Sequence, residues 1–148
     1  MKKVLLIDDD EDDQEFFIEQ LLEYKSNLEI ISAYDGEQGM KLIYTVKPKW
    51  VFLDVNLPRI NGLKLLESIK EFLQAENISV YMYSTNAALH NKREASKLGA
   101  KYYFQKPESI PELRSIFKKA FEFLTEKNRL RNLKRFLKEI WFFIAFLQ

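Results

Sequence analysis

Cysteine is absent from this chain of 148 residues, which excludes disulfide bonds and thiolate metal sites. Glycine and proline are scarce, at four residues each, while 47% of the residues are hydrophobic and 30% are charged, as in folded globular proteins rather than disordered or fibrous ones. Residues 4–7 form an apolar run too short for the core of a signal peptide. We therefore expect a cytoplasmic protein.

Further absences narrow the possible functions. No glycine precedes Gly36, so a glycine-rich turn that cradles a nucleotide phosphate cannot follow the first predicted strand. The apolar run at residues 140–147 is too short to span a bilayer, so we expect no transmembrane segment. The residues after Leu124 are too few for a helix-turn-helix or winged-helix domain, and we expect no specific binding of nucleic acid.

Charge is unevenly distributed along the chain. Residues 1–124 carry 17 Lys and Arg against 20 Asp and Glu, a net charge of −3, whereas residues 125–148 carry six against two, a net charge of +4. A chain of this length fits one domain with an appendage. We expect a mildly acidic domain over residues 1–124 and a basic tail over residues 125–148, with no separate output domain.

Five short apolar segments alternate with five segments of helical periodicity. The predicted strands are residues 4–7, 28–34, 50–53, 78–83 and 101–105, and the second is expected nearer the sheet edge because its apolar residues alternate with polar ones. A β-α order repeated five times predicts an α/β fold with a five-stranded, doubly wound parallel sheet and helices on both faces.

Polar side chains follow four of these strands. Asp8 and Asp9 come after the first strand, Asp54 after the third, Ser84 after the fourth and Lys106 after the fifth. Each alone has a structural explanation, as a helix cap, a turn hydroxyl or a solvated charge. Because the carboxyl ends of parallel strands face the ligand crevice, their common position predicts a site at that edge of the sheet.

Six consecutive acidic residues occupy positions 8–13. The helix dipole accounts for Glu11, Asp12 and Asp13, which precede an apolar helical face. Asp8 and Asp9 differ because they end a strand, where they can converge with Asp54 on one cation. Like charges at such close range repel unless a metal ion neutralises them.

These motifs resemble the receiver domain of bacterial two-component response regulators, in a single-domain form like the chemotaxis regulators, over residues 1–124. The matching residues are the acidic pair after V-L-L-I, Asp54 in F-L-D-V-N-L-P-R-I-N-G, Ser84, Tyr103, and the Lys106–Pro107 dipeptide. The resemblance implies a flavodoxin-like fold and a signalling role rather than a classical enzyme. It also implies that Asp54 receives a phosphoryl group from a sensor histidine kinase or phosphotransfer protein, and that the signal reaches a downstream protein target.

The resemblance further implies a Mg²⁺ cofactor. The ion would be held by Asp9, Asp54 and the backbone carbonyl of Asn56, with Asp8 acting mostly through water. Independently of the resemblance, phosphoryl transfer needs a positioned carboxylate, a divalent cation and a cationic side chain, and the sequence supplies the protein's share of these.

The family pattern also assigns roles after the fourth and fifth strands. Lys106 would contact the phosphoryl group, and Ser84 with Tyr103 would form the switch pair, although Thr is the commoner family choice at the position of Ser84. The peptide bond between Lys106 and Pro107 is expected to be cis, as in the family.

Two other interpretations compete with this one. The haloacid-dehalogenase-like phosphohydrolases begin with the signature hhhhDxD, in which Asp8 would be the nucleophile and Asp10 the acid/base, but Asp12 stands where that signature expects Thr or Val. The second is a docking module that works without phosphorylation. Phosphotransfer to Asp54 separates this module from the main hypothesis.

The tail has an amphipathic helical pattern with three- and four-residue spacing. Its apolar positions are Leu130, Leu133, Leu137, Ile140, Ile144 and Leu147, and most of the six cations lie elsewhere. Such a helix can fold back on its own domain, form a homodimer, dock to a partner or adsorb to an anionic membrane surface. We favour dimerisation or partner docking through residues 125–148, because the stripe has the width of a packing face.

Overall fold

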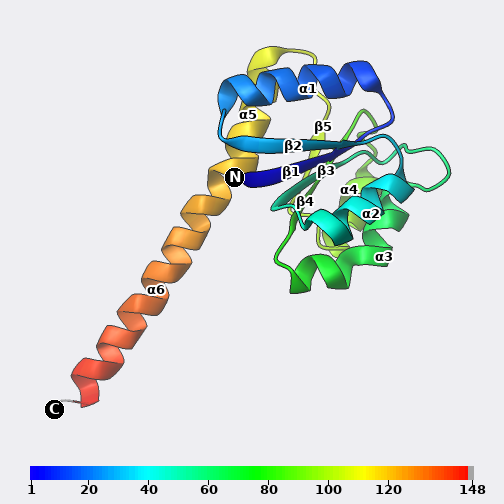
Figure 1. Ribbon diagram of the computed structural model, residues 1–148. Helices are drawn as coiled ribbons and strands as arrows, with labels where there is room; N and C mark the ends of the chain where they lie inside the picture. The colour runs from blue at the N-terminus through cyan, green and yellow to red at the C-terminus, as the bar shows by residue number, and fades with distance from the viewer. Residues whose placement is uncertain (147–148) are drawn as a thin grey trace. The chain divides into compact units, whose positions relative to one another are not determined.

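The computed structural model describes residues 1–146 and has eleven helices and strands within them (Figure 1). The elements are, in chain order, β1 (Lys2–Ile7), α1 (Glu11–Tyr24), β2 (Leu28–Ala33), α2 (Gly36–Val46), β3 (Trp50–Leu53), α3 (Gly62–Ala75), β4 (Ser79–Ser84), α4 (Leu89–Lys97), β5 (Tyr102–Gln105), α5 (Ile110–Phe121) and α6 (Phe123–Phe146). The predicted strands and helices are all present, and the strand ends lie within two residues of the predicted ones, as is usual for element boundaries.

The five strands form one parallel sheet in the order β2-β1-β3-β4-β5, which confirms the predicted α/β fold with flavodoxin-like topology. The edge position of β2 agrees with its alternating pattern. β1, β3 and β4 are interior strands, and the side chains of β3 are buried along its whole length. The switch in strand order lies between β1 and β3, where ligands bind in open α/β sheets.

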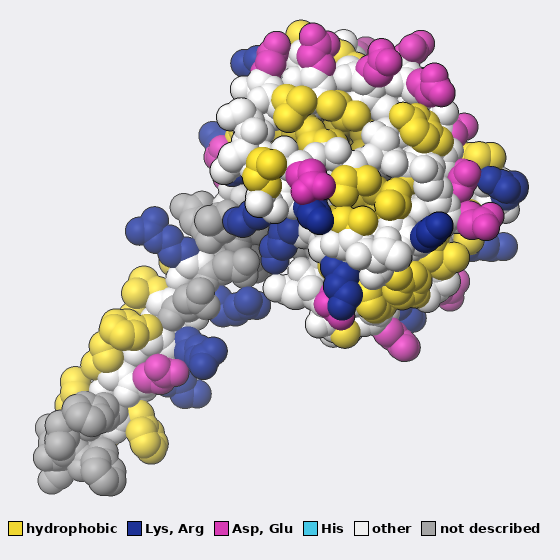
Figure 2. All heavy atoms as spheres, in the orientation of Figure 1, with side chains coloured by type: hydrophobic (Ala, Val, Ile, Leu, Met, Phe, Trp, Pro, Cys, Tyr) yellow, Lys and Arg dark blue, Asp and Glu magenta, His cyan; other side chains and the backbone are white. Residues whose placement is uncertain are grey.

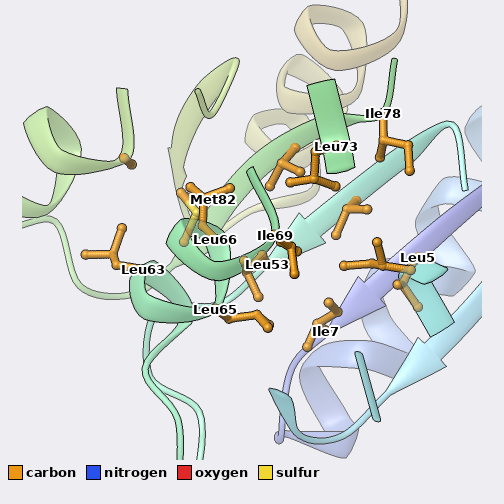
Figure 3. Packing of buried hydrophobic residues seen from close by; sticks show 14 of the residues in the cluster. Leu5, Ile7, Leu53, Leu63, Leu65, Leu66, Ile69, Leu73, Ile78 and Met82 are labelled. Carbon is orange, nitrogen blue, oxygen red and sulfur yellow. The ribbon is translucent and has the colours of Figure 1, made fainter. Parts of the chain in front are cut away.

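One face of the sheet packs an aliphatic core against α2, α3 and α4. Leu5 and Ile7 from β1, Leu53 from β3 and Met82 from β4 lie against the buried side of α3, as Figure 3 shows. The buried leucines of α3 recur every three or four residues, which is the period of a helical face. This packing fixes the sheet behind the residues that follow each strand.

The opposite face carries a cluster of aromatic side chains. Phe17 of α1 meets Phe52 and Tyr83 with ring centroids 4.9 and 5.2 Å apart, and Phe52 lies beside Tyr81 at 5.2 Å. Phe104 continues the row at 5.7 Å from Tyr81. Edge-on pairs of this kind stabilise by about 0.5–1.5 kcal/mol beyond the area that they bury.

Three helices that follow strands of the sheet, α1, α2 and α3, begin at polar caps. Asp10 accepts a hydrogen bond from the Asp13 amide at the start of α1, and Asp35 accepts one from the Gln38 amide at the start of α2. Asn61 caps α3 in the same way. These caps satisfy amides that a helix leaves unpaired, and they fix where each loop turns into its helix.

The chain divides into two compact units between Arg114 and Ser115. In the first unit, Arg114 of α5 forms an ion pair with Glu23 of α1 at 3.3 Å. The second unit contains the rest of α5 and the 24-residue helix α6. Leu147, the last position of the predicted stripe, lies outside the described residues. Within residues 1–146, no helix is sufficiently long and apolar to cross a bilayer.

Candidate functional site

The backbone hydrogen bonds of the sheet continue for one residue beyond the ends of three strands. These bonds fix the positions of three predicted site residues. The amide of Asp8 donates to the carbonyl of Ala33, that of Asp54 to Ile7, and that of Lys106 to Ser84, each at 3.0 Å. Each bond joins a residue to the end of a neighbouring strand. Asp8, Asp54 and Lys106 are therefore placed by strand pairing rather than by flexible loops.

The ammonium group of Lys106 lies among three carboxylates. Its Nζ is 2.6 Å from Asp8, 2.7 Å from Asp13 and 3.1 Å from Asp54. Its side chain is only 10% exposed, and Nζ also lies 5.9 Å from the ring centroid of Tyr83. Burial lowers the pKa of Lys106, but its contacts with Asp13 and Asp8 outweigh this effect and raise the pKa above its usual value. The lysine therefore stays charged.

Asp8 is the most deeply buried carboxylate of the site. It is 1% exposed, and burial raises its pKa because the charged form loses hydration, although Lys106 opposes the rise. Its Oδ1 accepts a hydrogen bond from the Asp10 amide at 3.0 Å, and its buried Oδ2 lies 2.6 Å from the ammonium group of Lys106. Both oxygens of this buried carboxylate therefore have a partner within the chain.

Asp8, Asp9 and Asp54 each bring a carboxylate oxygen within 4.8 Å of the others. With Asp13, the site holds four carboxylates against one ammonium, a formal net charge of −3. Hard oxygen ligands on adjacent strand ends suit a divalent cation such as Mg²⁺, and Asp9 is exposed, which leaves the cation a route to water. The donor set and the excess negative charge of the site therefore fit the predicted ion.

The loop after β3 is packed closely around Asp54. The Asn56 amide donates to Oδ1 of Asp54 at 3.1 Å, and the Gly62 amide donates to the Val55 carbonyl at 2.8 Å. A Cβ atom at Gly62 would lie 2.0 Å from the Asp54 carbonyl oxygen. Gly62 is therefore needed for close packing, whereas the residue of this loop with a left-handed backbone is Arg59, with φ 67°.

Ser84 and Tyr103 lie beside the same edge of the sheet. Ser84 is fully buried, and its Oγ accepts a hydrogen bond from the Asn86 amide at 3.3 Å. The Tyr103 hydroxyl donates to the carbonyl of Asn86, so both predicted switch residues contact one loop residue. Burial raises the pKa of Tyr103, and hydrogen bonding to Ser84 and Asn91 opposes the rise.

One predicted feature of the site is wrong. None of the peptide bonds in the described part of the chain is cis, so the bond between Lys106 and Pro107 is trans. The trans form is favoured by about 0.5–1 kcal/mol at an X-Pro bond without further constraint. The Lys106 amide still pairs with Ser84, and the side chain still reaches Asp54.

Sequence reasoning missed two residues that brace the site. Asp13 was assigned to the helix dipole, but its carboxylate also binds Lys106. Gln14 is buried and donates from its amide nitrogen to the carbonyls of Asp8 at 2.7 Å and Ala33 at 2.8 Å. The available signal was their position in the first turn of a helix that directly follows the acidic strand end.

Comparison with known proteins agrees with this architecture. The sequence profile of the response regulator receiver domain matches residues 4–118 of the chain. The chain therefore belongs to the response regulator receiver domain family, which consists of signalling domains of two-component systems rather than classical enzymes. Receiver domains of this family interact with histidine kinases or phosphotransfer proteins.

Curated relatives come from several kinds of signalling protein. The chain is 32% identical over 120 residues to the alkaline phosphatase synthesis transcriptional regulatory protein PhoP of Bacillus subtilis, covering 79% of this chain and 47% of that protein. It is 29% identical over 121 residues to sporulation initiation phosphotransferase F of the same organism, covering 80% and 92%. A histidine kinase of Formosa agariphila is 30% identical over 88% of this chain, which spans only 9% of that kinase.

Solved structures show the same fold. A CheY-like response regulator receiver domain from Methanospirillum hungatei superposes with a TM-score of 0.74 at 26% identity, covering 87% of this chain and 98% of that one. The chain spans less than half the length of PhoP, so the activity of such a longer regulator does not transfer to it directly.

Proposed function

We propose that the chain accepts a phosphoryl group on Asp54 in a Mg²⁺-dependent reaction and signals through the change that follows. The observation that carries this proposal is the contact of Asp54 with Lys106 at 3.1 Å, inside a cluster of carboxylates that suits a divalent cation. The donor would be a sensor histidine kinase or a phosphotransfer protein, and the receiver of the signal a downstream protein.

In the proposed reaction, an oxygen of Asp54 attacks the phosphorus of the donor. The bond from phosphorus to the donor nitrogen breaks, its electron pair stays on the imidazole, and an acyl phosphate forms. Asp9, Asp54 and the Asn56 carbonyl, with Asp8 acting mostly through water, would hold a Mg²⁺ ion, which would supply positive charge to the phosphoryl oxygens. The Asn56 amide orients Asp54 by its hydrogen bond to Oδ1.

Lys106 supplies the fixed positive charge of the site. Its ammonium group has three N–H donors, so it can contact a phosphoryl oxygen while it keeps its hydrogen bond to Asp13. A preorganised cation of this kind stabilises the transferred group without the cost of moving into place. Asp13 and Asp8 thus position Lys106 in this proposal.

The switch would begin at Ser84. A phosphoryl group on Asp54 offers oxygen acceptors to the Ser84 hydroxyl, which would draw the loop at Asn86 inward. The Tyr103 hydroxyl now bonds to the Asn86 carbonyl, so movement of that loop changes the surroundings of Tyr103. Comparing the protein with and without a phosphoryl mimic by NMR tests this step, and unchanged signals at Ser84 and Tyr103 would contradict it.

The reaction itself is tested with acetyl phosphate and Mg²⁺, with mass spectrometry of the labelled peptide. We expect one phosphoryl group on Asp54, loss of the label in Asp54→Asn and after removal of Mg²⁺ with EDTA, and a weaker label in Lys106→Met. Lys64→Met, on the exposed side of α3, is a matched control that should label normally. Absence of label in the wild type would support phosphorylation-independent docking, and label on Asp8 would support the phosphohydrolase-like chemistry.

A further inference from the structure

The middle of α6 presents an exposed apolar stripe. Leu130, Leu133 and Leu137 are 54%, 50% and 55% exposed, although leucine side chains are usually covered. Figure 2 shows hydrophobic side chains along one side of the helix and Lys and Arg side chains along another. A stripe of this kind indicates a surface that is covered by something else in the working protein.

The apolar character spreads around the helix from Ile140 onward. Trp141 and Phe142 are 72% and 74% exposed, and Ile144 is 52% exposed. Because successive residues are 100° apart around a helix, Phe142 lies about 200° from Ile140 and about 140° from Leu137. A second helix packed along the leucine stripe would therefore leave Phe142 in water. By the same spacing Phe142 lies about 20° from Arg131 and about 40° from Lys138, so an interface whose headgroups contact these cations also covers Phe142.

Positive charge accompanies this apolar surface. Residues 129–139 contain five Lys and Arg and a single acidic residue, Glu139, which gives a net charge of +4. Arg135 forms an ion pair with Glu139 at 3.3 Å. In a parallel pair of such helices, Arg129 and Lys134 flank the stripe at positions that face each other across the seam, so like charges would meet. An anionic surface instead complements every one of these cations.

We propose that α6 binds the surface of a bilayer that contains anionic lipids. The leucine stripe and Trp141 enter the boundary between headgroups and acyl chains, while Phe142 lies with Arg131 and Lys138 at the level of the headgroups, where the cations contact the lipid phosphates. The helix lies in the interface rather than across the membrane, in keeping with the lack of a spanning helix among the described residues. This binding is separate from phosphorylation of Asp54 and does not depend on it.

Trp141 provides a direct reporter of this binding. The other tryptophan, Trp50, is 5% exposed in the sheet, so Trp50→Phe leaves one exposed indole on α6. We expect its emission to shift to shorter wavelength with vesicles of phosphatidylcholine and phosphatidylglycerol, but not with phosphatidylcholine alone. The wild-type chain should cosediment with the same anionic vesicles, and high salt should release it. This second measurement needs no variant.

Two variants separate lipid from protein as the occupant of the helix surface. Phe142→Ser, off the leucine stripe, should weaken vesicle binding by about tenfold, since a phenyl group no longer enters the interface. The triple change of Arg131, Arg135 and Lys138 to Glu should abolish the preference for anionic vesicles. The same charge change at Lys64, Lys70 and Lys97, all exposed and outside α6, should have little effect.

Other outcomes would overturn the proposal. Failure of the wild-type chain to bind either vesicle excludes a lipid surface. A concentration-dependent shift of Trp141 emission without vesicles, with a dimer mass in analytical ultracentrifugation and no effect of Phe142→Ser, assigns the stripe to a second copy of the chain. Far-UV circular dichroism and labelling of Asp54 by acetyl phosphate check that each variant is folded, and they distinguish failure of this proposal from failure of the phosphoryl transfer.

Discussion

Replacement of Lys106 by Met tests whether the buried charges of the site are balanced as the structure indicates. The substitution keeps the length of the side chain but removes the cation between Asp8, which is 1% exposed, and Asp54, which is 5% exposed. Removing one partner of a buried ion pair costs about 3–5 kcal/mol, because a buried charge is left without compensation. The contact with Asp13, which is 44% exposed, adds little because water screens it.

This loss is large compared with the total free energy of unfolding of a small domain, which is about 5–15 kcal/mol. Urea denaturation followed by circular dichroism at neutral pH, with EDTA present, measures it from the change of midpoint at constant slope. The Asp54→Asn change should recover part of the loss in the Lys106→Met background, since it removes one of the uncompensated charges. Lys64→Met, at an exposed position of α3, should change the free energy of unfolding by less than about 0.5 kcal/mol.

The free energy of unfolding lost in Lys106→Met should also depend on pH in a defined direction. Burial raises the pKa of Asp8 in the folded state above its usual 3.8, so acid protonates Asp8 in the folded chain before the unfolded one. The cost of burying its charge is present at neutral pH and is relieved as the pH falls through the folded-state pKa toward 3.8. The difference in free energy of unfolding between the wild type and Lys106→Met should therefore become smaller on acidification.

In the wild type, Lys106 contributes stability below its usual pKa of 10.5 that is lost as the pH rises through its higher folded-state pKa. Two results would refute this reasoning. Either Lys106→Met lowers the free energy of unfolding by less than about 1 kcal/mol at neutral pH, or adding Asp54→Asn recovers none of the loss. Each would show that the buried carboxylates do not need the charge of Lys106 for stability.

Other changes test the supports of the site and the core. Gly62→Ala should cost about 1–3 kcal/mol and reduce acetyl phosphate labelling, because its Cβ would collide with the Asp54 carbonyl; normal labelling and an unchanged urea midpoint would contradict this. Gln14→Leu should cost about 1–3 kcal/mol in urea denaturation, because it leaves the buried Asp8 carbonyl without one of its donors, and a neutral effect would count against the bracing role. Phe52→Ala should cost about 3–5 kcal/mol by thermal denaturation, as a fully buried ring is lost, and a much smaller cost would show that the aromatic cluster collapses into the space.

The parts of the fold that the sequence predicts well are those set by local periodicity. β3 coincides with its predicted residues, because four consecutive buried side chains have few other interpretations. The site residues Asp8, Asp54 and Lys106 could be placed together because parallel topology brings the strand ends to one edge.

The features that the sequence did not predict depend on distances between residues far apart in the chain. The contact of Asp13 with Lys106 joins positions 93 residues apart, and the helix dipole gives an acidic first turn a sufficient local explanation. The role of Gly62 depends on how closely α3 approaches the Asp54 carbonyl, which no turn signal reports. The trans bond at Pro107 shows that a feature taken from family resemblance need not hold in each member.

The hydrogen bonds that seat Asp8, Asp54 and Lys106 at the ends of neighbouring strands have a kinetic consequence. Each joins segments that are distant in sequence, so the cation site does not exist until all five strands have paired in register, a late event in folding dominated by non-local contacts. A bound divalent cation would then stabilise only the finished sheet. It would slow unfolding and leave the folding rate nearly unchanged, so that occupancy of the site sets the lifetime of the native chain.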